Sequence, residues 1–403
     1  YDIVVTKLNA TGSDIIGSVK IGGRGNDGVN IVVSRAGTQS LQRNYGDDGR
    51  SEVILDGAGN VYVASCTQSN SSDPQSKFPT TPGVFQPNSG NPGSTNPSGD
   101  GQDGVVLKLN PDLSTLLFSS YLGGSKNDAA YVLDLSPTGD IYVAGGTQSS
   151  DFPGNKAATL GPTFNTGSSA DNSIDGFIAQ ISNNGSTIIR STYAGTVNAD
   201  QIYGIKFDRL GFPYITGQTE GAWPVLNAPY SEPNGKQFIA KLQPDLSAYV
   251  YSTVFGKGGT TPDISPTAFL VDRCENVYVS GWGGANGQAN VYHSAGTNGL
   301  GVTPDAYKPT TDGHDFYFFV LQRNATGRLY ASFFGKNGGQ YGDHVDGGTS
   351  RFDPNGVIYQ GVCANCMGGA VFPVTPGVWG PVNGALPDGC NLGMIKMAFN
   401  LAG

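Results

Sequence analysis

The chain has 403 residues with a net charge of −9, and only 14% of its residues are charged. Phosphate binding requires a basic surface, so this composition argues against a nucleic-acid partner. Low charge density with many aromatic residues argues against disorder, and no run approaches the roughly 18 apolar residues of a membrane span.

Short segments typical of β-strands occur in chain order from the first residues onward. The first expected strand covers 2–8, and the second ends at the glycines that follow Ile21. The most complete unit lies between Tyr121 and Gly195, where alternating apolar residues predict four short strands joined by turns and one longer loop. The chain is therefore expected to be all-β.

The four-strand pattern then repeats along the rest of the chain. The second strand of each unit begins at Val61, Ile141, Pro213, Val277 and Val357, so the spacing is 64 to 80 residues. Third strands are expected to begin at Asp2, Asp103, Asp175, Gln237, Asp315 and Met394. The loop between the second and third strands contains most of the variation in length.

A four-stranded unit cannot bury both of its faces alone, and radial stacking of such units is the simplest solution. A solenoid is the structural alternative, but its units are usually shorter. We therefore expect a single β-propeller domain over 1–403. Its predicted parts are a half blade at 1–23, blades at 51–124, 128–195, 200–256 and 263–335, and an incomplete last blade at 346–403.

Two motif sets that recur in phase suggest a family. The first is the loop sequence Phe-Pro-x-Thr-Pro-Gly-Val-aromatic at 78–85 and 372–379, and the second combines Tyr-Leu-Gly-Gly at 121–124 with Asn-Val-Tyr-Val at 276–279. Together they resemble the SBBP repeats, a bacterial family of seven-bladed propellers. The resemblance implies seven blades in the intact protein, of which this chain would supply about six.

A narrower resemblance, carried by segments 264–272, 276–284, 344–353 and 362–366, is to large Bacteroidota surface proteins. It implies export by the type IX secretion system, location on the outer cell surface, and a role in gliding motility or adhesion. The expected partners are translocon components during export and other surface proteins or glycans. Because Tyr1 opens directly into a strand pattern without a signal peptide, we expect a fragment of a longer protein.

The resemblance and the composition favour a non-catalytic scaffold or adhesion module. A carbohydrate- or protein-binding lectin-like module is the second hypothesis, and a propeller glycoside-active enzyme is the third. Catalysis is not expected, because nothing in the sequence places a nucleophile beside His293, His314 or His344. No cofactor is expected.

The five cysteines offer a disulfide or a metal site. Cys363 and Cys366 form a Cys-x-x-Cys pair, and the favoured disulfide joins one of them to Cys390. A structural zinc site needs four ligands, and the histidines lie in other units or far along the chain, so zinc is not favoured.

Two further sets of residues recur once per unit. Asp48, Asp128 and Asp200, with Asp263 and Asp346 near the same place, could bind calcium, but capping of the turn before each first strand is favoured. The loop aromatics could stack on sugar rings or simply fix each loop to its own blade, and the second interpretation is favoured. They are Phe85, Trp223, Tyr230, Tyr307 and Trp379.

Overall fold

The computed structural model describes residues 1–31, 40–43, 45–91, 101–165, 174–284, 295–339, 341–345, 350–366, 371–385, 389–399 and 401. Among these residues the secondary structure is almost entirely β-strand, with short 3-10 turns at Tyr45–Asp47 and Arg323–Ala325. No helix in the described ranges is long and apolar enough to cross a membrane.

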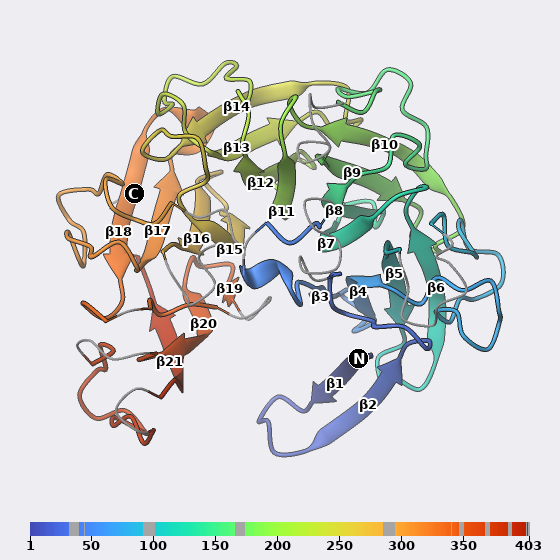
Figure 1. The fold of residues 1–403 in the computed structure, drawn as a ribbon, viewed down its shortest axis with the longest axis horizontal. Coiled ribbons are helices and arrows are strands. Elements are labelled where there is room, and N and C mark those ends of the chain that lie inside the picture. The colour runs from blue at the N-terminus through green and yellow to red at the C-terminus, as the bar shows by residue number, and fades with distance from the viewer. Residues whose placement is uncertain are drawn as a thin grey trace. The chain divides into compact units, whose positions relative to one another are not determined.

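The described residues form twenty-one strands, which are grouped in consecutive antiparallel sheets (Figure 1). The first unit contains β1 Ile3–Leu8, β2 Ile15–Ile21, β3 Glu52–Leu55, β4 Val61–Thr67, β5 Asp103–Leu109, β6 Leu116–Leu122, β7 Asp128–Leu135, β8 Ile141–Thr147, β9 Asp175–Ile181, β10 Ile188–Ala194 and β11 Asp200–Phe207. The remaining strands are β12 Pro213–Thr219, β13 Gln237–Leu242, β14 Tyr249–Phe255, β15 Ser265–Val271, β16 Val277–Trp282, β17 Phe316–Leu321, β18 Arg328–Phe334, β19 Ser350–Phe352, β20 Ile358–Ala364 and β21 Asn391–Met397.

The sheets are the blades of a β-propeller, and five blades of about four strands are present. Four of them have four strands, β3–β6, β7–β10, β11–β14 and β15–β18, and the last has the three strands β19–β21. The pair β1–β2 forms a separate two-stranded sheet. The all-β propeller class expected from the repeat is confirmed, with five blades and one two-stranded sheet in the described residues. A total of seven blades stays a prediction.

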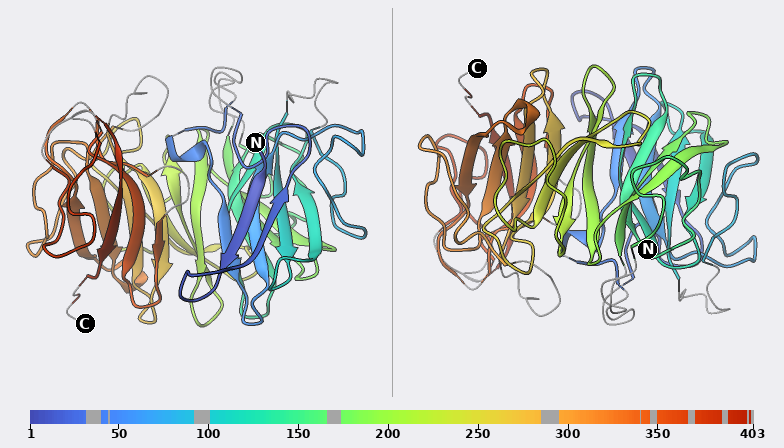
Figure 2. Two further views of the ribbon diagram at one scale, coloured as in Figure 1. Left: turned by 90° about the horizontal axis from the view of Figure 1, so that it is seen from below. Right: turned by 90° about the horizontal axis from the view of Figure 1, so that it is seen from above.

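Two compact units divide the chain. The first contains 1–42, 47–213 and 243–248, and the second contains 43–46, 214–242 and 249–403. Figure 2 shows the strands of the first unit, coloured blue to green, standing side by side with loops at both ends.

Apolar side chains between consecutive sheets form the core of each unit. In the first unit β7 packs against β3, β4 and β5, and β11 packs against β7, β8 and β9. Buried residues such as Tyr62, Ile141 and Phe177 fill one such space, while Ile3 and Leu107 belong to another. In the second unit one cluster, including Phe318 from β17 and Ile395 from β21, spans the last two sheets. At these places the faces of consecutive sheets bury one another, as the four-strand repeat requires.

A tyrosine in the fourth strand fixes the long loop of its own blade. The Tyr121 hydroxyl donates to the Ser69 carbonyl at 2.7 Å and accepts from the Phe78 amide at 2.8 Å. The next blade repeats this arrangement, with the Tyr193 hydroxyl between the Ser149 carbonyl and the Phe152 amide. The tyrosines near the ends of these two fourth strands therefore have a structural function.

Candidate functional site

Buried carboxylates meet where one blade ends and the next begins. Asp103 opens β5 and Asp128 opens β7, and both are buried. A Cβ atom at Gly123 would lie 2.3 Å from Asp103 Oδ1 and 2.7 Å from Asp128 Oδ2, so both carboxylates approach the backbone of this glycine closely. The Gly124 amide donates to Asp128 Oδ2 at 2.8 Å, which caps the turn before β7.

The same arrangement occurs one blade later with Asp175, Asp200 and Gly195. The Asn165 amide donates to Asp175 Oδ2 at 2.7 Å, while Asp175 Oδ1 is buried without a hydrogen-bond partner among the described residues. Burial, together with the charge of Asp200, raises the pKa of Asp175 to about 8. Burial likewise raises the pKa of Asp103 to about 7.

The second unit neutralises the equivalent position with other residues. Gln237 opens β13 where Asp175 opens β9, and its amide faces the Asp263 carboxylate. Lys257 Nζ lies 3.5 Å from Asp263 Oδ1. In the following blade Lys308 Nζ lies 2.6 Å from Asp315 Oδ1. Asp103, Asp128 and Asp175 of the first unit form no such salt bridge among the described residues.

These contacts support turn capping by Asp128, Asp200 and Asp263, each of which accepts a backbone amide four to six residues earlier. The prediction that Asp48 caps such a turn is wrong, because Asp48 is exposed and accepts a hydrogen bond from the Gln42 side chain. Asp27 caps the equivalent turn by accepting from the Gly23 amide. The capping position was predicted by its distance from the turn that follows β3, and the long segment between Asp27 and β3 makes that distance larger than in the other blades. Asp346 lies outside the described residues.

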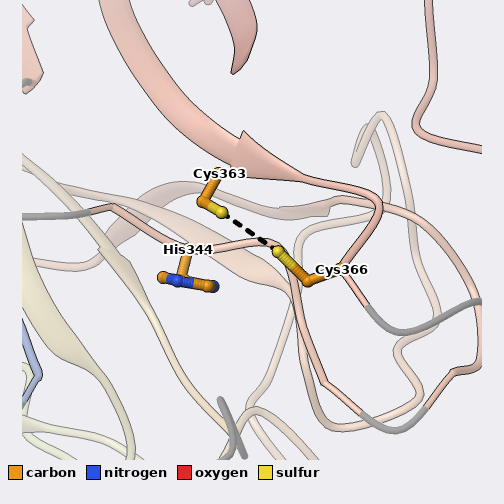
Figure 3. Close-up of side chains that lie close together, drawn as sticks. All are labelled: His344, Cys363 and Cys366. Carbon is orange, nitrogen blue, oxygen red and sulfur yellow. Dashed lines mark hydrogen bonds between the residues drawn. The ribbon is translucent and has the colours of Figure 1, made fainter. Parts of the chain in front are cut away.

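A cluster of sulfur and imidazole groups lies at the end of β20. Cys366 forms a disulfide with Cys390, and Cys363 Sγ lies 3.0 Å from Cys366 Sγ. His344 pairs with Cys363 through two backbone hydrogen bonds of 3.1 and 2.8 Å. Figure 3 shows Cys363 and Cys366 pointing toward one another, with the His344 ring beside them.

Sequence reasoning missed His344 as a neighbour of these cysteines, because 18 residues separate it from Cys363 and only the bridge between their backbones joins them. Of the other cysteines, Cys66 is buried in β4 and Cys274 is exposed, and neither forms a disulfide in the part of the chain that the structure describes. His314 is half-buried, and His293 lies outside the described residues.

The five loop aromatics divide into two groups. Trp223 is only 6% exposed, stacks on Phe238 with ring centroids 3.6 Å apart, and donates from Nε1 to the Ser252 hydroxyl. Phe85 packs against the core, and Tyr230 contacts Phe319 at 6.1 Å. Trp223 therefore fixes its loop to its own blade, which is the favoured interpretation, and is too buried to stack on a sugar ring.

The two remaining aromatics are exposed and lie in one cleft of the second unit. Tyr307 is 64% exposed and Trp379 is 100% exposed. Both line a cleft of 670 Å³ whose other walls include the segment from Val371 to Asn383 and the strand β21.

The strand β21 is itself unusual among the third strands of the blades. Its equivalents β5, β9, β13 and β17 are buried along almost their whole length. In β21, by contrast, Leu392 is 74% exposed and Met394 is 71% exposed. The sheet order β19-β20-β21 places β21 at the edge, where each of the other blades has a fourth strand.

No protein-family model and no curated protein matches the chain. Among solved structures, it is similar to a puromycin hydrolase (TM-score 0.35, 10% identity, 80% of this chain and 43% of that chain) and a thermostable family-43 glycoside hydrolase (TM-score 0.33, 9% identity, 87% of this chain and 91% of that chain). An S511A mutant of puromycin hydrolase complexed with PGG is also similar (TM-score 0.35, 10% identity, 86% of this chain and 49% of that chain), so the chain spans less than half the length of the puromycin hydrolase chains. Likenesses at these TM-scores carry no conclusion about activity, and the chain stands as a β-propeller protein without a family assignment.

Proposed function

We propose that this chain is a non-catalytic β-propeller scaffold that binds other proteins at the bacterial cell surface, through the exposed edge of β21. The observation that carries the proposal is the difference in burial between β21 and the third strands of the other blades. Unpaired backbone groups and exposed apolar side chains on an edge strand favour pairing with another strand.

An extended polypeptide strand is the occupant that fits this edge. In each of the other blades the equivalent place is filled by an antiparallel strand, for example β18 against β17. The cleft beside β21 is lined by Leu392, Met394 and the apolar residues of the 371–382 segment. Strand addition would therefore combine backbone hydrogen bonds with pockets for alternate apolar side chains.

The finer assignments rest on sequence resemblance. The motifs at 78–85 and 372–379 support membership of the SBBP-repeat family, with seven blades in the intact protein. Export by the type IX secretion system, contact with its translocon components, and a role in adhesion or gliding motility on the outer cell surface belong to the same proposal.

The test is selection of random peptides displayed on phage against the purified chain. We expect the selected peptides to alternate apolar and polar residues and to lose binding in a Met394→Arg variant, because a charge would lie inside the new strand pair. Leu117→Arg is the matched control, since Leu117 is an exposed apolar residue on β6 of a four-stranded blade. Failure to select peptides, or equal binding by wild type and Met394→Arg, would contradict protein binding at this edge.

The second candidate function is carbohydrate binding, favoured by the full exposure of Trp379 beside Tyr307 in the same cleft. Exposed aromatic rings can stack on sugar rings. A glycan array probed with wild type and Trp379→Ala distinguishes the two functions. Glycan binding that is lost in Trp379→Ala and retained in Met394→Arg would replace the protein-binding proposal.

A further inference from the structure

The cluster at the end of β20 brings together more ligand groups than one disulfide uses. Ligand atoms of His344, Cys363 and Cys366 all lie within 4.8 Å of one another. Cys390 is bonded to Cys366, so its sulfur belongs to the same cluster. Three sulfurs and one imidazole therefore meet at one place.

From this geometry we infer that the reduced chain binds one Zn²⁺ ion through His344, Cys363, Cys366 and Cys390. Three thiolates and one imidazole form a ligand set typical of structural zinc sites, in which all four tetrahedral positions are filled by protein. Zinc bonds of about 2.3 Å to sulfur place the sulfurs about 3.8 Å apart. The 3.0 Å between Cys363 and Cys366 Sγ needs only a small opening to reach that separation.

The backbone positions the ligands before any metal binds. The paired hydrogen bonds between His344 and Cys363 hold these two residues opposite one another. Asn365, inside the Cys-x-x-Cys segment, donates its amide to Asp343 Oδ1 at 2.8 Å. The Lys336 ammonium donates to the Cys366 carbonyl, which places a positive charge near the thiolates. These contacts hold the 343–344 segment against the 363–366 turn, as a structural metal site requires.

The hydrogen bond of the His344 ring indicates which nitrogen would bind the metal. Nδ1 lies 3.0 Å from the Gly342 carbonyl oxygen, which can only accept, so Nδ1 carries the hydrogen. In the neutral ring the lone pair is then on Nε2. A backbone carbonyl that fixes the tautomer in this way is the usual outer partner of a metal-binding histidine.

Metal binding and the disulfide are alternative states of the same sulfurs. Reduction of the Cys366–Cys390 bond by a thiol or phosphine reductant takes two electrons and yields two thiols. Zinc then displaces the three thiol protons to solvent, without any change of oxidation state. The bound ion would join three segments of the last blade: the 344 bridge, the end of β20 and the residue before β21.

The test uses the full chain, reduced with a phosphine and loaded with Zn²⁺ or Co²⁺ alone. We expect one metal ion per chain by native mass spectrometry, and a Co²⁺ absorption spectrum with thiolate charge-transfer bands and tetrahedral d–d bands. Cys363→Ser and His344→Gln should each weaken Zn²⁺ binding at least tenfold. Cys274→Ser is the matched control, since Cys274 is exposed and outside the cluster, and it should bind like wild type.

If a variant fails to fold, metal binding by the reduced wild-type chain alone tests the inference. A reduced wild-type chain that binds no stoichiometric metal, or gives no tetrahedral Co²⁺ spectrum, overturns the inference. Undiminished binding by a folded Cys363→Ser or His344→Gln chain, or loss of binding in Cys274→Ser alone, overturns it as well. None of these outcomes depends on peptide binding at β21, so the two proposals fail separately.

Discussion

Replacing Asp175 with asparagine should stabilise the protein at pH 8, although it changes a fully buried residue. In the folded chain burial and the charge of Asp200 raise the pKa of Asp175 to about 8, from a value of 3.8 without these effects. Between these two values the folded state binds more protons than the unfolded state, so stability falls as pH rises from about 4 to about 8.

The size of the effect follows from the pKa difference. At about 1.36 kcal/mol per unit, a shift of about four units sets an upper limit of about 6 kcal/mol at pH 8. Relaxation of the surrounding structure reduces this to about 2–4 kcal/mol. Asparagine removes the charge and keeps the acceptor for the Asn165 amide. Gln237 already provides a neutral amide at the equivalent place in the second unit.

Urea denaturation followed by far-ultraviolet circular dichroism at pH 4.5 and pH 8 measures this effect. Tryptophan fluorescence would not, because Trp223, Trp282 and Trp379 all lie in the second unit, whereas Asp175 lies in the first. Asp175→Asn should gain stability at pH 8 and change little at pH 4.5. Asp305→Asn, which removes the same charge from an exposed position, should change little at either pH.

Equal destabilisation of Asp175→Asn at both pH values would refute the reasoning, as would a wild-type stability that does not change between pH 4 and pH 8. Either result would mean that the buried charge is compensated. If added Ca²⁺ then stabilised wild type and not Asp175→Asn, the calcium hypothesis from the sequence would replace that of an uncompensated carboxylate.

The remaining predictions concern packing and hydrogen bonding. Trp223→Ala should cost about 3–5 kcal/mol, because it empties the stack on Phe238, while Trp379→Ala should change stability by less than about 0.5 kcal/mol; urea midpoints compare the two. A similar cost for both would contradict the burial of Trp223. Tyr121→Phe should cost about 1 kcal/mol, because it removes both hydrogen bonds of the hydroxyl while the Phe78 amide keeps its 3.0 Å bond to the Ser69 carbonyl, and amide exchange at Phe78 should accelerate. Unchanged exchange at Phe78 would show that this hydroxyl does not fix the loop.

Most of the blade pattern could be read from the sequence, because strand pairing follows a short local period. Alternating apolar residues and recurring turn residues located the strands around Val61, Ile141 and Val277. Turn capping by Asp128 could also be predicted, since the amide that it binds is only four residues away. The prediction placed Asp48 wrongly, because a long segment separates the capping residue Asp27 from β3, the first strand of the blade.

The candidate site could be predicted only in part. The sequence suggested a disulfide between Cys390 and the Cys-x-x-Cys pair, and the structure joins Cys366 to Cys390. Nothing in the spacing indicated that His344 would lie beside Cys363, or that Tyr307 and Trp379 would remain exposed while Trp223 was buried. Similar loop motifs predict similar local turns, but the exposure of each ring depends on what packs over it.

The sequence by itself determined the all-β class, the four-strand repeat and the turn chemistry, because each of these depends on residues close together in the chain. Tertiary structure decided which side chains meet across strands and blades. The carboxylates of Asp175 and Asp200 share one buried place, and the His344 ring lies beside Cys363 and Cys366. Such properties depend on contacts between segments that are far apart in the sequence, and a local sequence pattern does not predict which distant segments meet.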